Sequence, residues 1–336
     1  MNVSASASAS ASPPVALLLP GQGSQYDRMA VGLHAAEPVF AAALESVFEA
    51  MGEEGARVRA DWLAERPLVP LDHATRSQPL LFAVDYALGR LVESWGVRPA
   101  ALLGHSVGET VAATLGGVFR MEDAARLIVE RTRVLVTAPP GGMLAVAAPE
   151  RELTDVLTGD VVVGAVNAPR QTILAGPEEA LRKAAEVLRE RHLVCQTVPS
   201  HSAFHSPLMA PAALATEPLF APVRTGTPTV PVYSAYTTAP LTPEQITDPA
   251  FWARQPAEPV LFWGALRRLL DDGDFTLLEA GPGQGLTRVA RRHPAVRAGR
   301  STVRPLLPAG PGPGDRDVAA VRAAADELVA LGHRLG

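Results

Sequence analysis

Five residues, GHSVG at 104–108, restrict the fold more than any other feature of this 336-residue chain. They follow a short apolar run, AALL, and precede ETVAATLGGVF, which is typical of a helix. Glycines at 104 and 108 permit a sharp turn between a buried strand and a helix, which presents the Ser106 hydroxyl at the helix start. We therefore expect an α/β protein with Ser106 as a candidate nucleophile. The alternative is an ordinary turn serine in a glycine-rich chain.

A second glycine loop, PGQGSQ at 20–25, also follows an apolar run, VALLL. Loops at the carboxyl ends of strands collect ligand sites in open α/β sheets. Its glycines allow backbone N–H groups to approach a substrate oxygen, as the N–H of Val107 does after a nucleophile. The loop alone is a weak indication of function.

A serine nucleophile needs a general base. His105 adjoins Ser106, but adjacent side chains on such a turn diverge, so we expect a structural role for His105. The segment SHSAFHSPLM at 200–209 supplies His201 and His205. Spacing alone favours a surface or packing role for either histidine.

The segment 141–199 has a pattern of its own. Its apolar runs predict strand, helix, strand, strand, helix, strand, with the first helix at 150–159. This is the ferredoxin-like order, so we expect a small inserted subdomain. The remaining boundaries that we predict are a disordered Ser-Ala arm at 1–13, a large subdomain at 14–140 and 200–307, and a linker with a C-terminal helix at 308–336.

Composition excludes several classes of protein. The formal net charge of −5 gives no reason to expect nucleic acid or an anionic membrane as a partner. The single cysteine, Cys195, excludes an intrachain disulfide and cysteine-based metal sites. No run of 18 apolar residues and no signal-peptide pattern occurs, so we expect a cytoplasmic protein without a membrane span, a metal or a cofactor.

Six motifs occur together in one order: PGQGSQ, GHSVGE, ERTR at 130–133, NAP at 167–169, AFHSPLM at 203–209 and EAGPGQGL at 279–286. In this order and spacing they resemble the malonyl-CoA:acyl-carrier-protein transacylases, and more closely the acyltransferase domains of modular polyketide synthases. The resemblance covers roughly residues 14–335. It implies an α/β-hydrolase-like large subdomain with a parallel sheet, a ferredoxin-like insertion, and ping-pong acyl transfer through an acyl-serine.

The resemblance also implies roles for individual residues. Ser106 matches the nucleophile and His205 the general base, which the family orients through a backbone carbonyl. The backbone N–H groups of Gln22 and Val107 match the oxyanion hole. Arg131 matches the arginine that binds the free carboxylate of malonyl-type substrates, as a planar guanidinium suits a carboxylate. For Arg131 the alternatives are a solvated helix arginine and an ion pair with the neighbouring glutamate.

Four further residues are implied to line the substrate site. Gln78 and Asn167 match polar residues of the site. Phe204 and the valine after the nucleophile resemble the malonyl-selective type. Ser202 fits neither the malonyl nor the methylmalonyl pattern, so it leaves the identity of the acyl group open.

The segment 288–304 carries six arginines and no acid. A basic surface is what docking an acidic carrier protein requires, and we assign this role to Arg291, Arg292, Arg297 and Arg300. A solvated helix end is the alternative interpretation, because cations are common there.

We therefore expect a free-standing, monomeric acyltransferase of polyketide or antibiotic biosynthesis, which moves a malonyl-type group from CoA to an acyl carrier protein. CoA thioesters and phosphopantetheinyl carriers are then its substrates. The alternatives are a transferase of larger starter or aminoacyl groups between carrier proteins, an acyl hydrolase, and a non-catalytic docking protein. The match to Arg131 argues against the first two alternatives.

Overall fold

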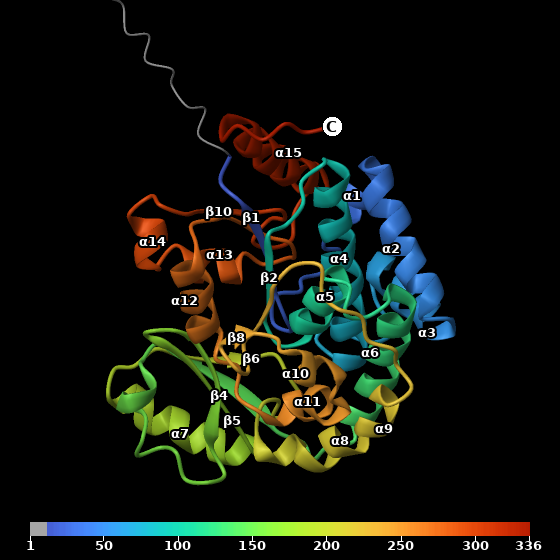
Figure 1. Cartoon of the computed structure of the whole chain (residues 1–336). Coiled ribbons are helices and arrows are strands. Elements are labelled where there is room, and N and C mark those ends of the chain that lie inside the picture. The colour runs from blue at the N-terminus through green and yellow to red at the C-terminus, as the bar shows by residue number, and fades with distance from the viewer. Residues whose placement is uncertain (1–11) are drawn as a thin grey trace, which may run out of the picture.

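The computed structural model describes residues 12–336, so nearly all of the arm predicted at 1–13 lies outside the described residues. The large subdomain is built on a six-stranded sheet (Figure 1). Its strand order is β10-β9-β1-β2-β7-β8, and all pairs are parallel except β7 with β8. The strands are β1 Val15–Leu19, β2 Ala101–Gly104, β7 Val232–Ser234, β8 Ala239–Pro240, β9 Thr276–Glu279 and β10 Thr302–Pro305.

Strand β1 shows why this sheet carries helices on both faces. All five of its residues are buried, because successive side chains point to opposite faces and each face is covered. Val15, Leu17 and Leu19 belong to one hydrophobic core, whereas Ala16 and Leu18 belong to the other. The α/β class predicted from the sequence is therefore confirmed.

The helices form two unequal layers around this sheet (Figure 1). The larger core contains residues of α1 Val31–Ala36, α2 Pro38–Ala50, α3 Glu53–Leu63, α4 Ala74–Ser94, α5 Val107–Leu115, α6 Met121–Leu135 and α15 Asp315–Ala330. The other face is covered by α12 Phe262–Asp272, α13 Gly285–Ala290 and α14 Pro294–Arg297. The connecting segments hold α8 Ala210–Ala215, α9 Glu217–Phe220, α10 Pro243–Thr247 and α11 Pro249–Arg254. No helix within residues 12–336 combines the length and the apolarity that crossing a membrane requires.

The small subdomain contains a four-stranded antiparallel sheet in the order β4-β5-β3-β6. Its strands are β3 Gly142–Val146, β4 Val162–Ala168, β5 Gln171–Gly176 and β6 Cys195–Val198, and its helix is α7 Glu178–Glu190. The helix predicted at 150–159 is wrong, since only a 3₁₀ turn forms, at Glu150–Glu152. Threonine, aspartate and valine, which favour helices weakly, occupy much of this segment, and Leu153 and Val156 reach the core from a loop instead.

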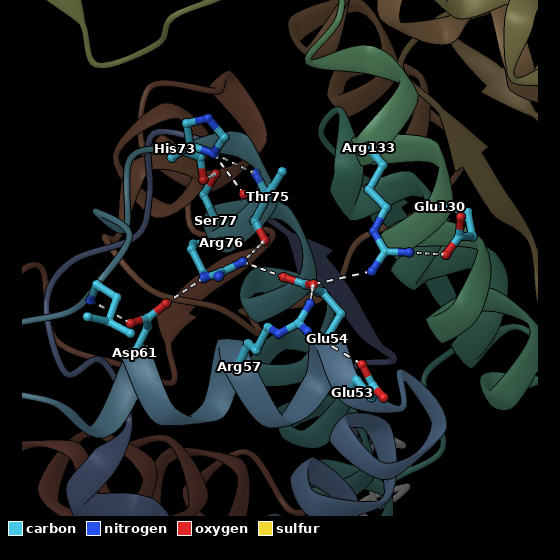
Figure 2. Close-up of polar contacts among 11 residues, drawn as sticks. Glu53, Glu54, Arg57, Asp61, His73, Thr75, Arg76, Ser77, Glu130 and Arg133 are labelled. Atoms are coloured by element: carbon cyan, nitrogen blue, oxygen red, sulfur yellow. Dashed lines mark hydrogen bonds and ion pairs between the residues drawn. The ribbon is translucent and has the colours of Figure 1, made fainter.

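A buried ion network joins three helices of the larger layer (Figure 2). Arg76 of α4 donates to Asp61 at 2.6 Å and to Glu54 at 2.5 Å, both on α3. Glu54 also accepts from Arg133 of α6 at 3.3 Å. Arg76 precedes Gln78 by two residues, so the network fixes the start of the helix that carries a predicted site residue.

We expect Arg76→Met to lower the free energy of unfolding by about 3 kcal/mol, because it leaves the buried Asp61 without a counter-charge, whereas Glu54 keeps Arg57 and Arg133. The exposed Arg182, which pairs with Glu179 and Glu186 on α7, is the control. Arg182→Met should cost less than about 1 kcal/mol. Urea unfolding measures both values, and equal losses would show that the network at Arg76 is not stabilising.

Candidate active site

The strand order brings the loops after β1, β2 and β9 to one edge of the large sheet. β1 pairs with β2 on one side and with β9 on the other, so the order of strands along the chain reverses direction at β1. Ligand sites form at the carboxyl ends of strands beside such a switch point. A cavity of about 370 Å³ lies here, lined on one side by loop residues such as Gln22 and Ser106 and on the other by strands of the small subdomain.

Ser106 lies in a strained turn between β2 and α5. Its backbone has φ 54° and ψ −119°, a conformation that costs a non-glycine residue on the order of 1–3 kcal/mol. The flanking glycines are required by close packing: a Cβ at Gly104 would lie 2.2 Å from the backbone nitrogen of Glu109. A Cβ at Gly108 would lie 2.1 Å from the carbonyl oxygen of Leu19. The predicted strand–turn–helix around Ser106 is therefore present.

The structure brings Ser106 and His205 together across 99 positions of sequence. Ser106 Oγ lies 2.8 Å from His205 Nε2. On the other side of the ring, Nδ1 lies 3.0 Å from the carbonyl oxygen of Glu258 and 3.3 Å from that of Gln255. Both neighbours of Nδ1 can only accept, so Nδ1 carries the proton and Nε2 is free to accept one from the serine.

Burial is the main cause that lowers the pKa of His205 to about 4. His105 and Arg131 act in the same direction, and the two carbonyl groups oppose them. The imidazole is consequently neutral at pH 7. A neutral imidazole in hydrogen-bond contact with a hydroxyl can act as a general base.

Two backbone donors close to Ser106 have no acceptor within the described part of the chain. These are the N–H groups of Val107, at the start of α5, and of Gln22, in the loop after β1. The Gln22 side chain is held from both ends: Nε2 donates to the carbonyl of Asp72 at 3.4 Å, and Oε1 accepts from Gln78 Nε2 at 3.2 Å. The two free N–H groups suit an oxyanion.

Arg131 is buried on α6, with 4% of its surface exposed. In residues 12–336 it forms no ion pair, and its Nε has no hydrogen-bond partner. The ion pair with Glu130 that the sequence left open does not form, because Glu130 contacts Arg133 at 2.6 Å instead. Arg131 does not line the cavity, but its charge acts on the pKa of His205. It is a buried guanidinium with an unused donor, and its charge reaches His205.

The other predicted site residues divide into two groups. Asn167 and Phe204 line the cavity, and Asn167 Oδ1 lies 2.8 Å from Nε2 of His105. Ser202 is buried but does not line the cavity. His201 is exposed and makes no contact with Ser106. The geometry therefore distinguishes His205, which contacts Ser106, from His201, which does not; their spacing in the sequence alone could not do so.

Sequence reasoning did not single out Glu109, although it belongs to the GHSVGE motif. Its buried carboxyl accepts from Ser234 Oγ at 3.2 Å and from Gln255 Nε2 at 3.1 Å. Burial raises the pKa of Glu109 to about 8, against the lowering effects of the Ala235 backbone N–H, the Ser234 hydroxyl and the charge of Arg131. An acid in the first turn of an otherwise apolar helix was the signal available.

Tyr236 was also missed, because it follows a strand of only three residues. Its ring centre lies 6.1 Å from that of His205, and its buried hydroxyl has no hydrogen-bond partner of normal geometry in residues 12–336. Burial raises the pKa of Tyr236, and Ser106 acts in the opposite direction. Tyr236 therefore keeps its proton and presents a donor near Ser106.

Residues 17–306 match the acyl transferase domain family, and the chain belongs to this family of acyltransferases. It is 36% identical over 291 residues to a phenolphthiocerol/phthiocerol polyketide synthase protein of Mycobacterium tuberculosis, covering 86% of this chain and 20% of that protein. It is 38% identical over 280 residues to the mycoketide-CoA synthase of the same species, covering 83% of this chain and 7% of that protein. The chain thus spans only a small part of these relatives.

Solved structures agree with this assignment. The acyltransferase domain from the second module of the salinomycin polyketide synthase has a TM-score of 0.85 and 34% identity, covering 97% of this chain and 75% of that one. The FabD structure from Acinetobacter baumannii has a TM-score of 0.83 at 22% identity, with 95% and 99% of the two chains covered, and so shares the fold.

The pKa of His205 leads to a pH prediction. The neutral form is the active one, so the rate of acylation from a thioester donor should fall only as pH drops toward about 4. Between pH 8 and 5.5 we expect little change, whereas a base of ordinary histidine pKa would lose about tenfold by pH 5.5. Single-turnover acylation across this range, with circular dichroism to confirm the fold, measures it. A midpoint at 6.5 or above would contradict the assignment.

Proposed function

We propose that this chain moves a malonyl-type acyl group from CoA to an acyl carrier protein through an acyl-Ser106 intermediate. The observation that carries the proposal is the 2.8 Å contact between Ser106 Oγ and His205 Nε2, with two unused N–H groups beside it. A nucleophile, a neutral base and an oxyanion site are the parts that acyl transfer requires.

The geometry supports the following sequence of steps. His205 Nε2 takes the proton of Ser106 as Oγ attacks the thioester carbon, and the N–H groups of Gln22 and Val107 stabilise the oxyanion. Collapse breaks the carbon–sulfur bond, and the departing CoA sulfur takes the proton from His205. In the second half-reaction the carrier thiol gives its proton to His205, attacks the ester, and the proton returns to Ser106.

Arg131 supports a substrate with a free carboxylate. A buried guanidinium with an unused donor is uncommon, because buried polar groups are normally hydrogen-bonded. A carboxylate on the acyl group would satisfy it, whereas a simple starter acyl group would not. One solved relative is the acyl transferase domain of SpnD in complex with 2-(pent-4-yn-1-yl)malonyl, at 27% identity and a TM-score of 0.88, with 96% and 78% of the two chains covered.

Transfer of a larger starter group is the second candidate function. It is supported by the similarity to the loading acyltransferase of the avermectin synthase, which has 28% identity and a TM-score of 0.82, with 94% and 99% of the two chains covered.

The effect of Arg131 on the choice of acyl group distinguishes the two candidate functions. We expect Arg131→Ala to depress Ser106 acylation by malonyl-CoA by about 100-fold, because the carboxylate loses its buried partner.

Acylation of the Arg131→Ala variant by acetyl-CoA should change by less than about threefold, since acetyl has no carboxylate to lose a partner. Both rates come from intact-protein mass spectrometry over time. An equal loss with both donors would mean that Arg131 is structural, and would leave the starter-acyl function as the better account.

The carrier is proposed to dock on the basic surface after α13. Arg291 and Arg297 are exposed and make no ion pair within residues 12–336. Arg300 is partly neutralised by Asp274 at 2.8 Å, and Arg292 contacts Gln171 at 3.5 Å. Gln171 is uncharged, so Arg291, Arg292 and Arg297 hold the free charge of this surface.

Reversing this charge should affect one half-reaction only. We expect Arg291→Glu with Arg297→Glu to raise the KM for the carrier by about tenfold and to flatten its salt dependence. Acylation from CoA needs no carrier and should not change. The exposed Arg57→Glu on α3 is the control. If the double variant left transfer to the carrier unchanged, docking at this surface would be refuted.

A further inference from the structure

The wall of the cavity at Ser106 is almost free of charge. Among the described residues that line it, Arg288 is the one aspartate, glutamate, lysine or arginine side chain. The histidine facing Ser106 is neutral because burial lowers its pKa to about 4. A cavity with a neutral wall and a single cation is suited to a largely neutral ligand that carries one anionic group.

Arg288 is free to meet such an anion. It is exposed on α13, and its side chain makes no hydrogen bond or ion pair within residues 12–336. Its charge reaches the buried Glu279, but that carboxylate already accepts from the backbone N–H groups of Leu286 at 3.0 Å and Thr287 at 2.7 Å. The guanidinium therefore has no internal counter-ion that an incoming ligand would have to displace.

The surroundings of Arg288 are open and slightly basic. Gly285, at the start of α13, has no atom within 4 Å of the position where a Cβ would lie, so the backbone at the rim is uncovered. Arg292, one turn beyond Arg288, lies 3.5 Å from Gln171 Oε1, and Gln171 also lines the cavity. Two arginines thus lie at this end of the cavity, with no acid in its lining.

We propose that Arg288 binds the phosphate of the phosphopantetheine arm, the group that a CoA donor and a carrier-protein acceptor share. This inference rests on the proposed function, because that function places a pantetheine thioester in the cavity. A pantetheine arm is neutral from its thioester to its phosphate, which matches the neutral wall between Ser106 and Arg288. A guanidinium pairs with phosphate oxygens through two parallel hydrogen bonds. One arginine would then serve both half-reactions, unlike the docking surface.

The test compares three malonyl donors that differ in phosphate: malonyl-CoA, malonyl-4′-phosphopantetheine and malonyl-pantetheine. For Arg288→Ala we expect kcat/KM of Ser106 acylation to fall about tenfold with the first two donors, as for loss of a charge-assisted hydrogen bond. With malonyl-pantetheine it should change by less than about twofold. Arg288→Lys should recover part of the loss, because it keeps the charge without the fork. The exposed Arg267→Ala on α12, outside the cavity lining, is the matched control.

Each outcome has one meaning. A loss confined to malonyl-CoA would assign Arg288 to the nucleotide phosphates and overturn the proposal. An equal loss with all three donors would assign it a structural role and overturn the proposal as well. If the unmodified chain accepted no acyl group from any donor, the proposed function would fail, whereas unmodified activity with no effect at Arg288 would refute only this inference.

Discussion

The contact between Ser106 and His205 depends on how closely two loops of the large sheet approach each other. Gly108 lies against the carbonyl of Leu19 at the end of β1, and a side chain at that position would separate β1 from α5. The N–H groups of Gln22 and Val107 belong to the segments that follow these two strands. Parallel pairing of β1 and β2 therefore brings Ser106 and the loop that holds Gln22 to the same edge of the sheet, before any contact with the small subdomain.

The small subdomain and the segment after it complete the site. His205 follows β6 directly in the chain, and its ring is held by carbonyl groups at 255 and 258 from a separate segment. Burial keeps this imidazole neutral, and it also leaves the Nε of Arg131 without a partner in residues 12–336. Exclusion of water causes both effects. It disfavours the charged form of the His205 imidazole, and it removes the solvent that would otherwise accept a hydrogen bond from Arg131.

Local signals explain what the sequence could predict. Two glycines around a serine, between an apolar run and a helix, specify the turn at 104–108 without tertiary information. The prediction of a helix at 150–159 was wrong because Leu153 and Val156 have helical spacing, but many of the residues around them are weak helix formers. Glu109 contacts Ser234, and Tyr236 lies near His205, only after distant segments of the chain come together. Ser202 is buried outside the cavity lining for the same reason. The surroundings of these three residues could therefore be known only from the folded structure.

The central claim is that Ser106 carries the acyl group, and intact-protein mass spectrometry after incubation with malonyl-CoA tests it most directly. The account predicts the mass of one malonyl group per chain, located by peptide mapping on Ser106 and absent from Ser106→Ala. No added mass on the folded chain, or an addition that persists in Ser106→Ala, would contradict it.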